Sequence, residues 1–224
     1  DCIEVGEVLE TWHKTVYEGK IPFESKDNQD TAYEQHAETL EGYCNKDSVL
    51  YVHLSEYDII GVEEKFFFPF KLGFTVNING DDYDTVYLNG AIDLVLEDYD
   101  GSRVIVDHKS SKKEFDKKKL NKNLQFPIYV LSQLYENKDI PDFRCVYHFT
   151  RHNTKQEVEI TPERLKETKS ELRRIFREMY DTKKYHQRLS PLCNWCDYSK
   201  DGTCLRGKRL IAIDYKEQNS KWEW

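Results

Sequence analysis

The chain has 224 residues, a formal net charge of −8 and 33% charged residues. This length allows one sizeable α/β domain or at most two small ones, and the 15 Tyr, 11 Phe and 4 Trp provide large apolar surfaces for a core. The acidic balance argues against a protein that coats nucleic acid generically, although an enzyme with a local basic groove remains compatible with it. No run approaches the roughly 18 apolar residues of a membrane span, and the N-terminal stretch lacks a signal-peptide pattern, so we expect a soluble cytoplasmic protein without membrane partners.

The N-terminal region, residues 1–45, is predicted to be helical. Residues 4–19 have the apolar spacing of an amphipathic helix, which glycine and proline end a few positions later. A polar loop is predicted at residues 23–30 and a second helix at residues 31–43.

Strands begin the central core, which we expect to cover residues 46–184 and to carry any catalytic residues. Residues 57–70 form one predicted strand, and Pro69 indicates that this strand ends there or lies at a sheet edge, because proline cannot donate a ladder hydrogen bond. Residues 73–79 form a further short strand before Gly80.

The most informative stretch runs from residue 89 to residue 109. Two alternating apolar runs flank Asp98-Tyr-Asp-Gly101, and an Asp-Gly step between such runs predicts a β-hairpin. A three-residue loop would place Asp93 opposite Asp107, with Lys109 on the same face. A two-residue turn would shift the register by one, but both carboxylates would remain at the same end of the hairpin.

Two carboxylates and a lysine on a half-buried sheet require a physical reason. Like charges repel at short distance and burial penalises both, whereas Mg²⁺ or Mn²⁺ bound by Asp93 and Asp107 removes the difficulty. Lys109 could then orient an attacking water or offset charge on a phosphoryl group. The alternative is a cross-strand acid pair at the surface with a solvated lysine, which the apolar neighbours Ile92, Leu94 and Val106 argue against.

A lysine-rich segment follows the hairpin. Residues 109–122 contain seven lysines against Glu114 and Asp116, which gives +5 locally. Such runs are usually solvated helix faces. Beside a phosphodiester-cutting site they would instead contact the nucleic-acid backbone, and the candidates for this role are Lys112, Lys113, Lys117, Lys118, Lys119 and Lys122.

A helix is predicted over residues 120–134. Gln125 and Tyr129 are four positions apart and share one face, so both can point at the sheet. Pro127 between them would kink a helix interior, but it is tolerated if the helix begins near Gln125. Tyr129 by itself could equally be a core residue.

The remaining core elements have simple signals. Residues 143–150 and 157–160 are predicted strands around a turn at residues 151–155, and Cys145 is expected to be a core thiol. A long amphipathic helix is predicted from Thr161, as N-cap, to about Lys184.

The C-terminal segment, residues 185–224, is rich in cysteine. Cys193, Cys196 and Cys204 have a spacing typical of a metal centre, because a C-x2-C turn lets two thiolates bind one ion. Spacing alone favours Zn²⁺, with His186 as a possible fourth ligand.

Three motifs occur in a characteristic order: Gly90-Ala-Ile-Asp93, Asp107-His-Lys109 and Gln125-Phe-Pro-Ile-Tyr129. As the set G-x-x-D, D/E-x-K, Q-x-x-x-Y they resemble the PD-(D/E)XK nuclease superfamily, in particular its RecB-like branch of bacterial, phage and CRISPR-adaptation nucleases. The resemblance covers about residues 58–204. It implies an α/β fold with a central mixed sheet flanked by helices, a restriction-endonuclease-like core, in a bacterial, archaeal or infected-host cytosol.

The resemblance also implies roles for residues. Gln125 and Tyr129 would support the site, the His108 carbonyl would be a further metal ligand, and an early helix would supply a histidine. Gly6 occupies that histidine position; Glu10 and His13 are possible substitutes, and a rival alignment selects His36. A strand glutamate near the metal would be Glu63 rather than its neighbour Glu64.

For the cysteines, the resemblance favours a 4Fe-4S cluster over zinc. Family members carry a C-terminal three-cysteine motif and a distant upstream fourth cysteine, for which Cys2 is the candidate and Cys44 the substitute.

Together these observations predict a single-domain, Mg²⁺- or Mn²⁺-dependent DNA nuclease, an exonuclease of recombination, repair or processing, with DNA as substrate and a helicase or recombinase as a possible partner. The first rival is a catalytically inert nucleic-acid-binding or assembly subunit that keeps the fold. The second is a zinc-stabilised interaction module.

Overall fold

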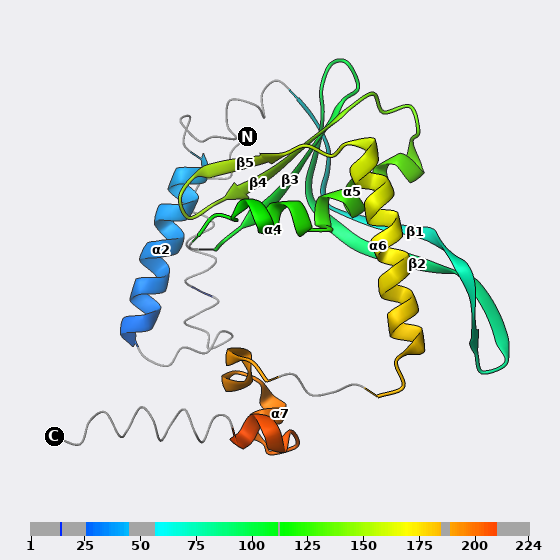
Figure 1. Ribbon diagram of the computed structural model, residues 1–224. Coiled ribbons are helices and arrows are strands. Elements are labelled where there is room, and N and C mark those ends of the chain that lie inside the picture. Colours follow the sequence, from blue (N-terminus) through cyan, green and yellow to red (C-terminus); the bar gives the residue numbers. More distant parts are fainter. Residues whose placement is uncertain (1–13, 15–25, 45–56, 112, 185–188, 210–224) are drawn as a thin grey trace. The chain divides into compact units, whose positions relative to one another are not determined.

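The computed structural model describes residues 14, 26–44, 57–111, 113–184 and 189–209, with the backbone alone at 26–30, 40, 43 and 44 (Figure 1). Its contacts divide the chain into two compact units, Asp1–Phe176 and Arg177–Trp224. The early helix, Cys2, Glu10, His13, Lys112 and His186 lie outside the described residues. Among the helices that are described, none is long and apolar enough to cross a membrane.

The first unit is built on a five-stranded mixed sheet, which confirms the predicted fold class. The strands lie in chain order: β1 (Asp58–Ile78), β2 (Asp81–Glu97), β3 (Arg103–Lys109), β4 (Phe143–Phe149) and β5 (Thr154–Val158). Only β3 and β4 are parallel. A parallel pair needs a crossover connection, and this one contains α4 (Lys117–Lys122) and α5 (Gln125–Glu136).

The β2–β3 hairpin has the register expected from a three-residue loop. Leu94 pairs with Val106 and Glu97 with Arg103. The Asp98 N–H donates to the Ser102 carbonyl at 2.8 Å, and Gly101 has a φ of 84°, the left-handed conformation that such loops need.

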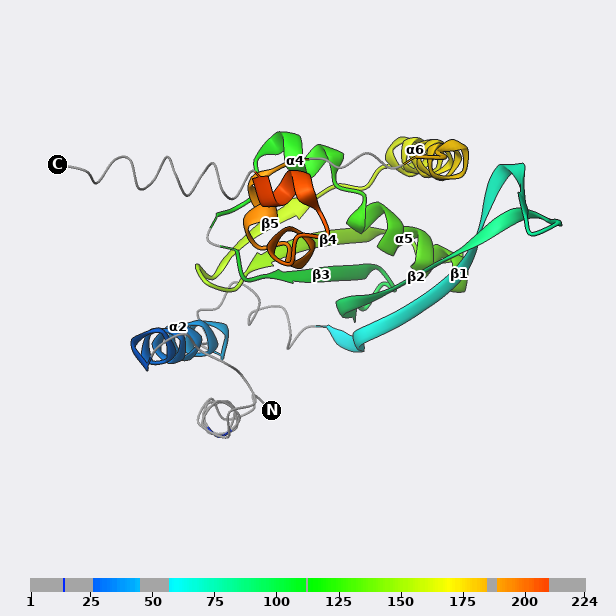
Figure 2. The ribbon, with the colours of Figure 1, turned by 90° about the horizontal axis from the view of Figure 1, so that it is seen from below.

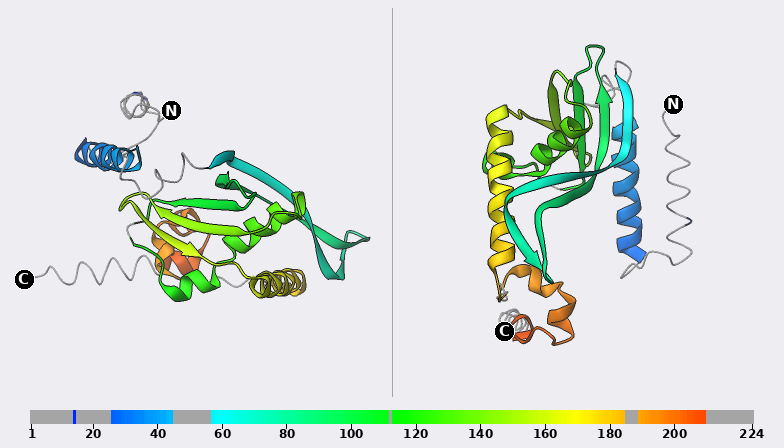
Figure 3. Two further views of the ribbon diagram at one scale, coloured as in Figure 1. Left: turned by 90° about the horizontal axis from the view of Figure 1, so that it is seen from above. Right: turned by 90° about the vertical axis from the view of Figure 1, so that its right-hand side faces the viewer.

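Strand β1 is longer than predicted. The two strands expected at residues 57–70 and 73–79 are one strand, which continues through Pro69 and lies at the sheet edge, as the proline had allowed. Its register against β2 shifts between Ile59 and Gly61 and again between Lys71 and Val76, where Gly73 has a φ of 76°. As Figure 3 shows, the β1–β2 hairpin continues past the end of β3.

The helices show two corrections to the prediction. The expected loop at residues 23–30 is partly helical, since α2 covers Lys26–Cys44. The expected helix over residues 120–134 is two helices, α4 and α5, and the second begins at Gln125, so that Pro127 falls in its first turn. Helix α6 (Pro162–Asp181) begins as predicted, with the Arg164 N–H donating to Thr161 Oγ1 at 3.2 Å.

Both faces of the sheet are apolar where β2, β3 and β4 pair. The cluster beneath α5 includes Ile92, Val95, Ile105, Phe126, Tyr129 and Tyr147. The other face carries Leu94, Leu96, Val104, Val106 and Val146. Figure 2 shows α4, α5 and α6 on the same side of the strands.

Side-chain alternation breaks on β2 beside the predicted site. Ile92 and Val95 are three positions apart and belong to the same cluster, whereas strict alternation would place them on opposite faces. The break falls at Asp93. At the same level of β1, Glu63 has a positive φ of 50°, an unusual conformation for a residue other than glycine.

The second unit contains two short helices among its described residues. They are the 3-10 helix η1 (Pro191–Asn194) and α7 (Asp197–Lys200), and they carry Cys193, Cys196 and Cys204.

Candidate active site

Asp107 is the centre of the predicted site, and it is 2% exposed. It lies on β3, on the face that α5 covers, because it follows Ile105 by two positions. Its Oδ2 forms an ion pair with Lys109 Nζ, and its Oδ1 accepts a hydrogen bond of 2.5 Å from Gln125 Nε2. Strand periodicity explains the first contact, and the start of α5 explains the second.

Helix α5 brings Gln125 and Tyr129 to this carboxylate. Gln125 Nε2 also donates to the Tyr129 hydroxyl at 2.8 Å, and Gln125 Oε1 accepts from Lys109 Nζ at 3.3 Å. The Gln125 amide therefore contacts the Asp107 carboxylate, the Lys109 ammonium group and the Tyr129 hydroxyl. The helical i, i+4 spacing places Tyr129 within reach of Gln125.

Asp93 lies on the neighbouring strand, one position beyond the last β2–β3 pair. Its Oδ2 accepts a 2.7 Å hydrogen bond from the backbone N–H of His108. This contact ties Asp93 to the Asp107-His108-Lys109 segment, so the two carboxylates lie at the same level of adjacent strands.

Burial dominates the electrostatics of the site. It raises the pKa of the Asp107 carboxyl; Lys109 opposes this rise, and the Asp93 carboxylate adds to it. Burial also raises the pKa of the Tyr129 hydroxyl, which keeps the phenol protonated. The site thus holds a carboxylate that is costly to charge, with one lysine as partial compensation.

The ring of His108 makes a contact that was not predicted from sequence. Its Nδ1 lies 3.1 Å from Nδ1 of His148 on β4, which is fully buried. Burial lowers the pKa of both imidazoles, that of His148 to about 4, and in the case of His148 the neighbouring His108 adds to the effect. Both rings are therefore neutral at pH 7, and one donates to the other.

The oxygen donors fit a hard divalent cation. Asp93 and Asp107 provide two carboxylates from adjacent strands, and Asp107 is buried, so that Lys109 only partly compensates the charge of its carboxylate. Within the described part of the chain, no group of three His, Cys, Asp or Glu side chains forms a metal site. An ion here would complete its shell with backbone oxygen, water and phosphate, as Mg²⁺ commonly does.

The two further predicted ligands lie in different environments. Glu63 is exposed at the level of Asp93, and its charge acts on His108. Glu64 turns toward α5 instead, where its Oε1 accepts from Gln133 Nε2 at 3.4 Å. His36 is an exposed residue of α2, and its Nδ1 lies 2.6 Å from the Ala32 carbonyl in the same helix.

Comparison with protein-family models gave a match to the PD-(D/E)XK nuclease superfamily over residues 5–200. The chain belongs to the PD-(D/E)XK nuclease superfamily. Comparison with curated proteins gave no match. One solved structure, titled "Crystal structure of SSO0001", matches with 13% identity over 88% of this chain and 95% of that chain, at a TM-score of 0.33. That similarity is too low to support an argument.

In this PD-(D/E)XK chain, the glycine of the G-x-x-D motif has a steric reason. A Cβ at Gly90 would lie 2.6 Å from Cζ of Phe66 on the paired strand. The Phe66 ring in turn packs edge-on against Tyr129, with 5.9 Å between ring centroids. The absence of a Cβ at Gly90 thus leaves room for the Phe66 ring, which in turn supports Tyr129.

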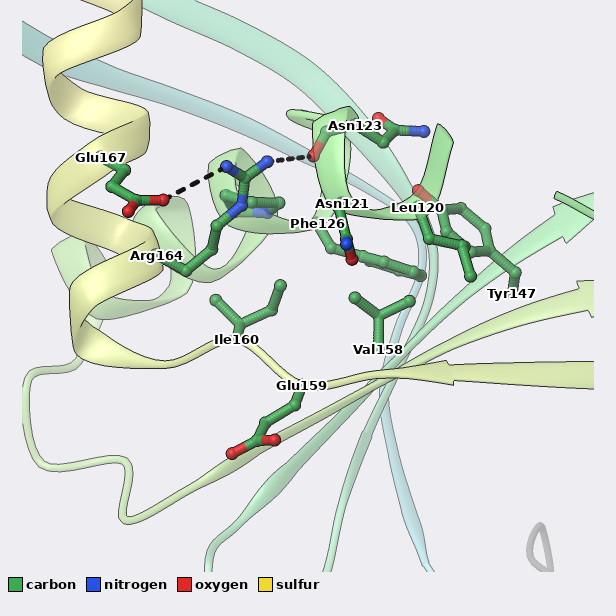
Figure 4. A pocket seen from close by; sticks show the side chains of 11 residues that line it. Leu120, Asn121, Asn123, Phe126, Tyr147, Val158, Glu159, Ile160, Arg164 and Glu167 are labelled. Atoms are coloured by element: carbon green, nitrogen blue, oxygen red, sulfur yellow. Dashed lines mark hydrogen bonds and ion pairs between the residues drawn. The ribbon is translucent and has the colours of Figure 1, made fainter. Parts of the chain in front are cut away.

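A cavity of about 300 Å³ lies beside the site, among α4, α5, β5 and α6 (Figure 4). Phe126 and Tyr147 line it, and Tyr147 also faces the site, because Lys109 Nζ lies 5.6 Å from its ring centroid. At the rim, Arg164 donates to the Asn123 carbonyl at 3.2 Å, while Asn123 Oδ1 accepts from the Gln125 N–H at 2.9 Å. Arg164 and Asn123, which the sequence did not single out, therefore help to hold the start of α5.

Beyond Lys109, the described lysines of the basic segment are exposed. Asp116 caps α4 through a 2.7 Å hydrogen bond from the Lys119 N–H, and Lys119 Nζ lies 3.6 Å from the Phe115 ring centroid. An open depression of about 410 Å³ is lined by Asp116, Lys118, Lys119, Lys122 and Asn123. Lys113 and Lys117 lie outside that lining.

Two of the three cysteines of the second unit have a feature typical of thiolate ligands. Cys193 Sγ accepts a backbone hydrogen bond from Ser190 at 3.5 Å, and Cys204 Sγ accepts one from Gly207 at 3.4 Å. The described residues do not complete a metal site around them. Of the proposed fourth ligands, Cys2 lies outside the described residues, and of Cys44 only the backbone is described.

Proposed function

We propose that this chain is a Mg²⁺- or Mn²⁺-dependent deoxyribonuclease, with exonuclease activity in DNA recombination, repair or processing. The observation that carries the proposal is the convergence of Lys109 and Gln125 on buried Asp107, with Asp93 at the same level of the next strand. Membership of a superfamily of nucleases supports the reaction class.

In the proposed mechanism, Asp93, Asp107 and the His108 carbonyl would hold the metal, with Glu63 as the candidate for a further ligand. When bound, a divalent cation would supply Lewis-acid chemistry at the scissile phosphate and an activated water. Lys109 would orient the attacking water or offset the charge that builds on the phosphate. Gln125 keeps both Asp107 and Lys109 in position, since it contacts each of them.

The basic segment would bind the substrate. Lys113, Lys117, Lys118, Lys119 and Lys122 supply exposed positive charge shortly after Lys109, and Lys112 belongs to the same run. Contacts of this kind hold the phosphate backbone and impose a salt dependence without reading sequence.

Cleavage of end-labelled single- and double-stranded DNA, with Mg²⁺, Mn²⁺ or chelator, tests the proposal. Asp107→Ala and Lys109→Ala should each abolish degradation, by about 10³-fold or more, while the melting temperature shows an intact fold. Asp139→Ala and Lys138→Ala are matched controls, because both side chains are exposed in the α5–β4 connection.

Full activity in Asp107→Ala or Lys109→Ala would refute the assignment. If the wild type binds no divalent ion in calorimetric titration and cuts no DNA, the chain is instead an inert nucleic-acid-binding or assembly subunit with the nuclease fold. A wild type that also fails to bind DNA at low salt would favour the interaction module.

For the second unit, we propose a structural 4Fe-4S cluster bound by Cys193, Cys196, Cys204 and Cys2. The N–H to Sγ hydrogen bonds on two of these cysteines support thiolate ligands. Protein purified without oxygen should be brown, with broad absorbance at about 400 nm and about four irons per chain. Serine at any of the four positions should remove the iron, whereas Cys145→Ala should not, because Cys145 is a buried thiol of β4. A colourless protein with stoichiometric zinc would refute the cluster.

A further inference from the structure

The β1–β2 hairpin has a part that no other strand accompanies. The β2–β3 pairing ends at Leu94 and Val106, whereas β1 and β2 stay paired through Lys71 and Thr85. Figure 2 shows the two strands running out beyond β3. This projecting part starts directly beside Asp93.

One face of the projecting part is covered. Phe66, Phe68 and Phe70 are each 5–6% exposed. Phe66 packs on Tyr129 and Phe68 on Tyr135 of α5, and Phe70 lies 6.2 Å from Phe176 of α6 between ring centroids. This inner face therefore needs no further partner.

The other face is open and carries an exposed aromatic pair. Phe67 is 65% exposed and Tyr87 is 58% exposed, yet their rings are stacked, with 4.6 Å between centroids and 7° between planes. Pleating places the outward residues of both strands in two rows: Lys65, Phe67, Pro69 and Lys71 on β1, paired with Ala91, Asn89, Tyr87 and Thr85 on β2.

The charge within these eight positions has one sign. Lys65 and Lys71 are exposed at the two ends of the β1 row, and neither row contains an acid, although the chain has a net charge of −8 and the next positions of the two rows toward the site are Glu63 and Asp93. The two lysines are six positions apart, which corresponds to about 20 Å of strand. The site residue Asp93 is two positions, or about 7 Å, beyond Ala91 along β2.

This combination matches the chemistry of single-stranded nucleic acid. Proteins that bind single strands without sequence preference combine aromatic rings, on which bases stack, with positive charge along the backbone path. A stable protein interface instead needs an apolar centre within roughly 800 Å² per partner, and here two rings are surrounded by lysine, asparagine and threonine.

We propose that this outward face, which we name the hairpin stripe (Lys65, Phe67, Lys71, Tyr87 and Asn89), binds a single-stranded segment of nucleic acid. Bases stack on Phe67 and Tyr87, and Lys65 and Lys71 contact phosphates. The inference rests on the proposed nuclease function and deepens it: the stripe ends at the Lys65–Ala91 pair, two positions from Asp93 along β2, on the sheet face opposite α5, and would hold a part of the substrate strand outside the site. It predicts a preference for substrates with a single-stranded extension.

Binding without cleavage tests the stripe independently of catalysis. The probe is a fluorescein-labelled oligothymidylate of about 20 nucleotides, titrated in chelator and followed by fluorescence anisotropy. The double variant Phe67→Ala/Tyr87→Ala should bind about tenfold or more weakly, since each stacked base contributes substantially to affinity. Phe67→Tyr and Tyr87→Phe keep the rings and should bind like the wild type.

Two matched controls isolate the stripe. Tyr99→Ala removes a ring that is 98% exposed in the β2–β3 loop and should leave affinity unchanged. Lys65→Ala and Lys71→Ala should each reduce the slope of log affinity against log salt by about 0.7, whereas Lys166→Ala, exposed on α6, should not.

Unchanged affinity in the double variant, or an equal loss in Tyr99→Ala, would overturn the stripe. A dimeric wild type whose double variant is monomeric in light scattering would also overturn it, in favour of self-association. If the double variant does not fold, Lys65→Glu/Lys71→Glu is measured in the same anisotropy titration. Weaker binding is then expected, and unchanged affinity would overturn the stripe. The two proposals can also fail separately. If the stripe variants lose binding but the wild type cleaves no DNA, the proposed nuclease function is refuted and the binding role of the stripe is supported.

Discussion

The two halves of β2 depart from the usual rule that apolar side chains are buried and charged ones are exposed, and they do so in opposite ways. Where β2 pairs with β3, both sheet faces are apolar, yet Asp93 and Asp107 carry charge into this region. Where β2 projects with β1 alone, one face is open to water, yet it presents Phe67 and Tyr87. Folding by itself would favour neither arrangement, because burying charge and exposing large apolar rings both cost free energy.

The comparison teaches where function lies along one strand. Residues that oppose stability in a folded protein usually have another use, and here the two kinds are separated by only a few positions. Buried Asp107 and partly buried Asp93 belong to the proposed chemistry, and the exposed rings belong to the proposed substrate binding. Substitutions in each half of the strand can test this division.

The largest expected effect concerns the buried charge balance of the paired half. The pKa of His148 is lowered to about 4, chiefly by burial, so the folded protein keeps this ring neutral. The unfolded chain gains a proton below about pH 6.5, and stability should therefore fall as the pH decreases from about 6.5 to 4, by on the order of 3 kcal/mol.

Urea unfolding at several pH values measures this effect. His148→Gln should flatten the dependence within that window, and His152→Gln, at an exposed position of the β4–β5 turn, should keep it. An unaltered pH dependence in His148→Gln would show that the paired half tolerates charge better than its burial indicates.

The second effect concerns the junction between the two halves. Gly90→Ala places a Cβ 2.6 Å from the Phe66 ring and should destabilise the protein by about 1–3 kcal/mol, because a packed ring must move. Cleavage should fall as well, since Phe66 supports Tyr129. Thermal unfolding and nuclease assays provide the two measurements.

Gly90→Ala has a rescue and a control. Phe66→Leu in the same chain removes the ring edge and should restore part of the stability. Gly42→Ala should be neutral or slightly stabilising, because nothing lies within 4 Å of the added Cβ and the position is helical. A destabilisation that Phe66→Leu leaves unchanged would contradict the proposed contact.

The smallest effect has the opposite sign. Burial raises the pKa of Asp107, so the charged form costs stability at neutral pH, although Lys109 offsets part of that cost. Asp107→Asn should therefore raise the melting temperature at pH 7 while it abolishes cleavage. The gain should fade toward pH 4 and below, where the wild-type carboxyl is protonated in the folded and unfolded states. A lower melting temperature at pH 7 would indicate that the Lys109 ion pair outweighs the burial.

Part of the site follows from short-range patterns. The Asp-Gly turn and the alternation of the flanking runs predict the β2–β3 hairpin and limit its register to two, of which the structure has the one with a three-residue loop. The strand period places Asp107 and Lys109 on one face in either case. The i, i+4 spacing places Tyr129 beside Gln125. These rules act over a few residues, so they can be read without knowledge of distant contacts.

Other features depend on residues far apart in the chain. The break between α4 and α5 was not predicted, because it is stabilised by Asn123 and by Arg164, which lies 41 residues later on α6. The run from Phe66 to Phe70 is apolar at every position, so its sequence does not show which face is covered. The division into a covered and an open face arises because α5 and α6 pack on one side.

The amino-acid sequence by itself determined that residues 89–109 form a hairpin and that Asp93 and Asp107 lie at the same end of it, since strand period and turn chemistry are properties of the local backbone. The structure then decided between the two registers that the turn allowed. Only the tertiary structure decided which faces of β1 and β2 meet water, why position 90 must be glycine, and which side chains hold Gln125. Those outcomes depend on burial, and burial depends on segments that approach one another only after the chain has folded.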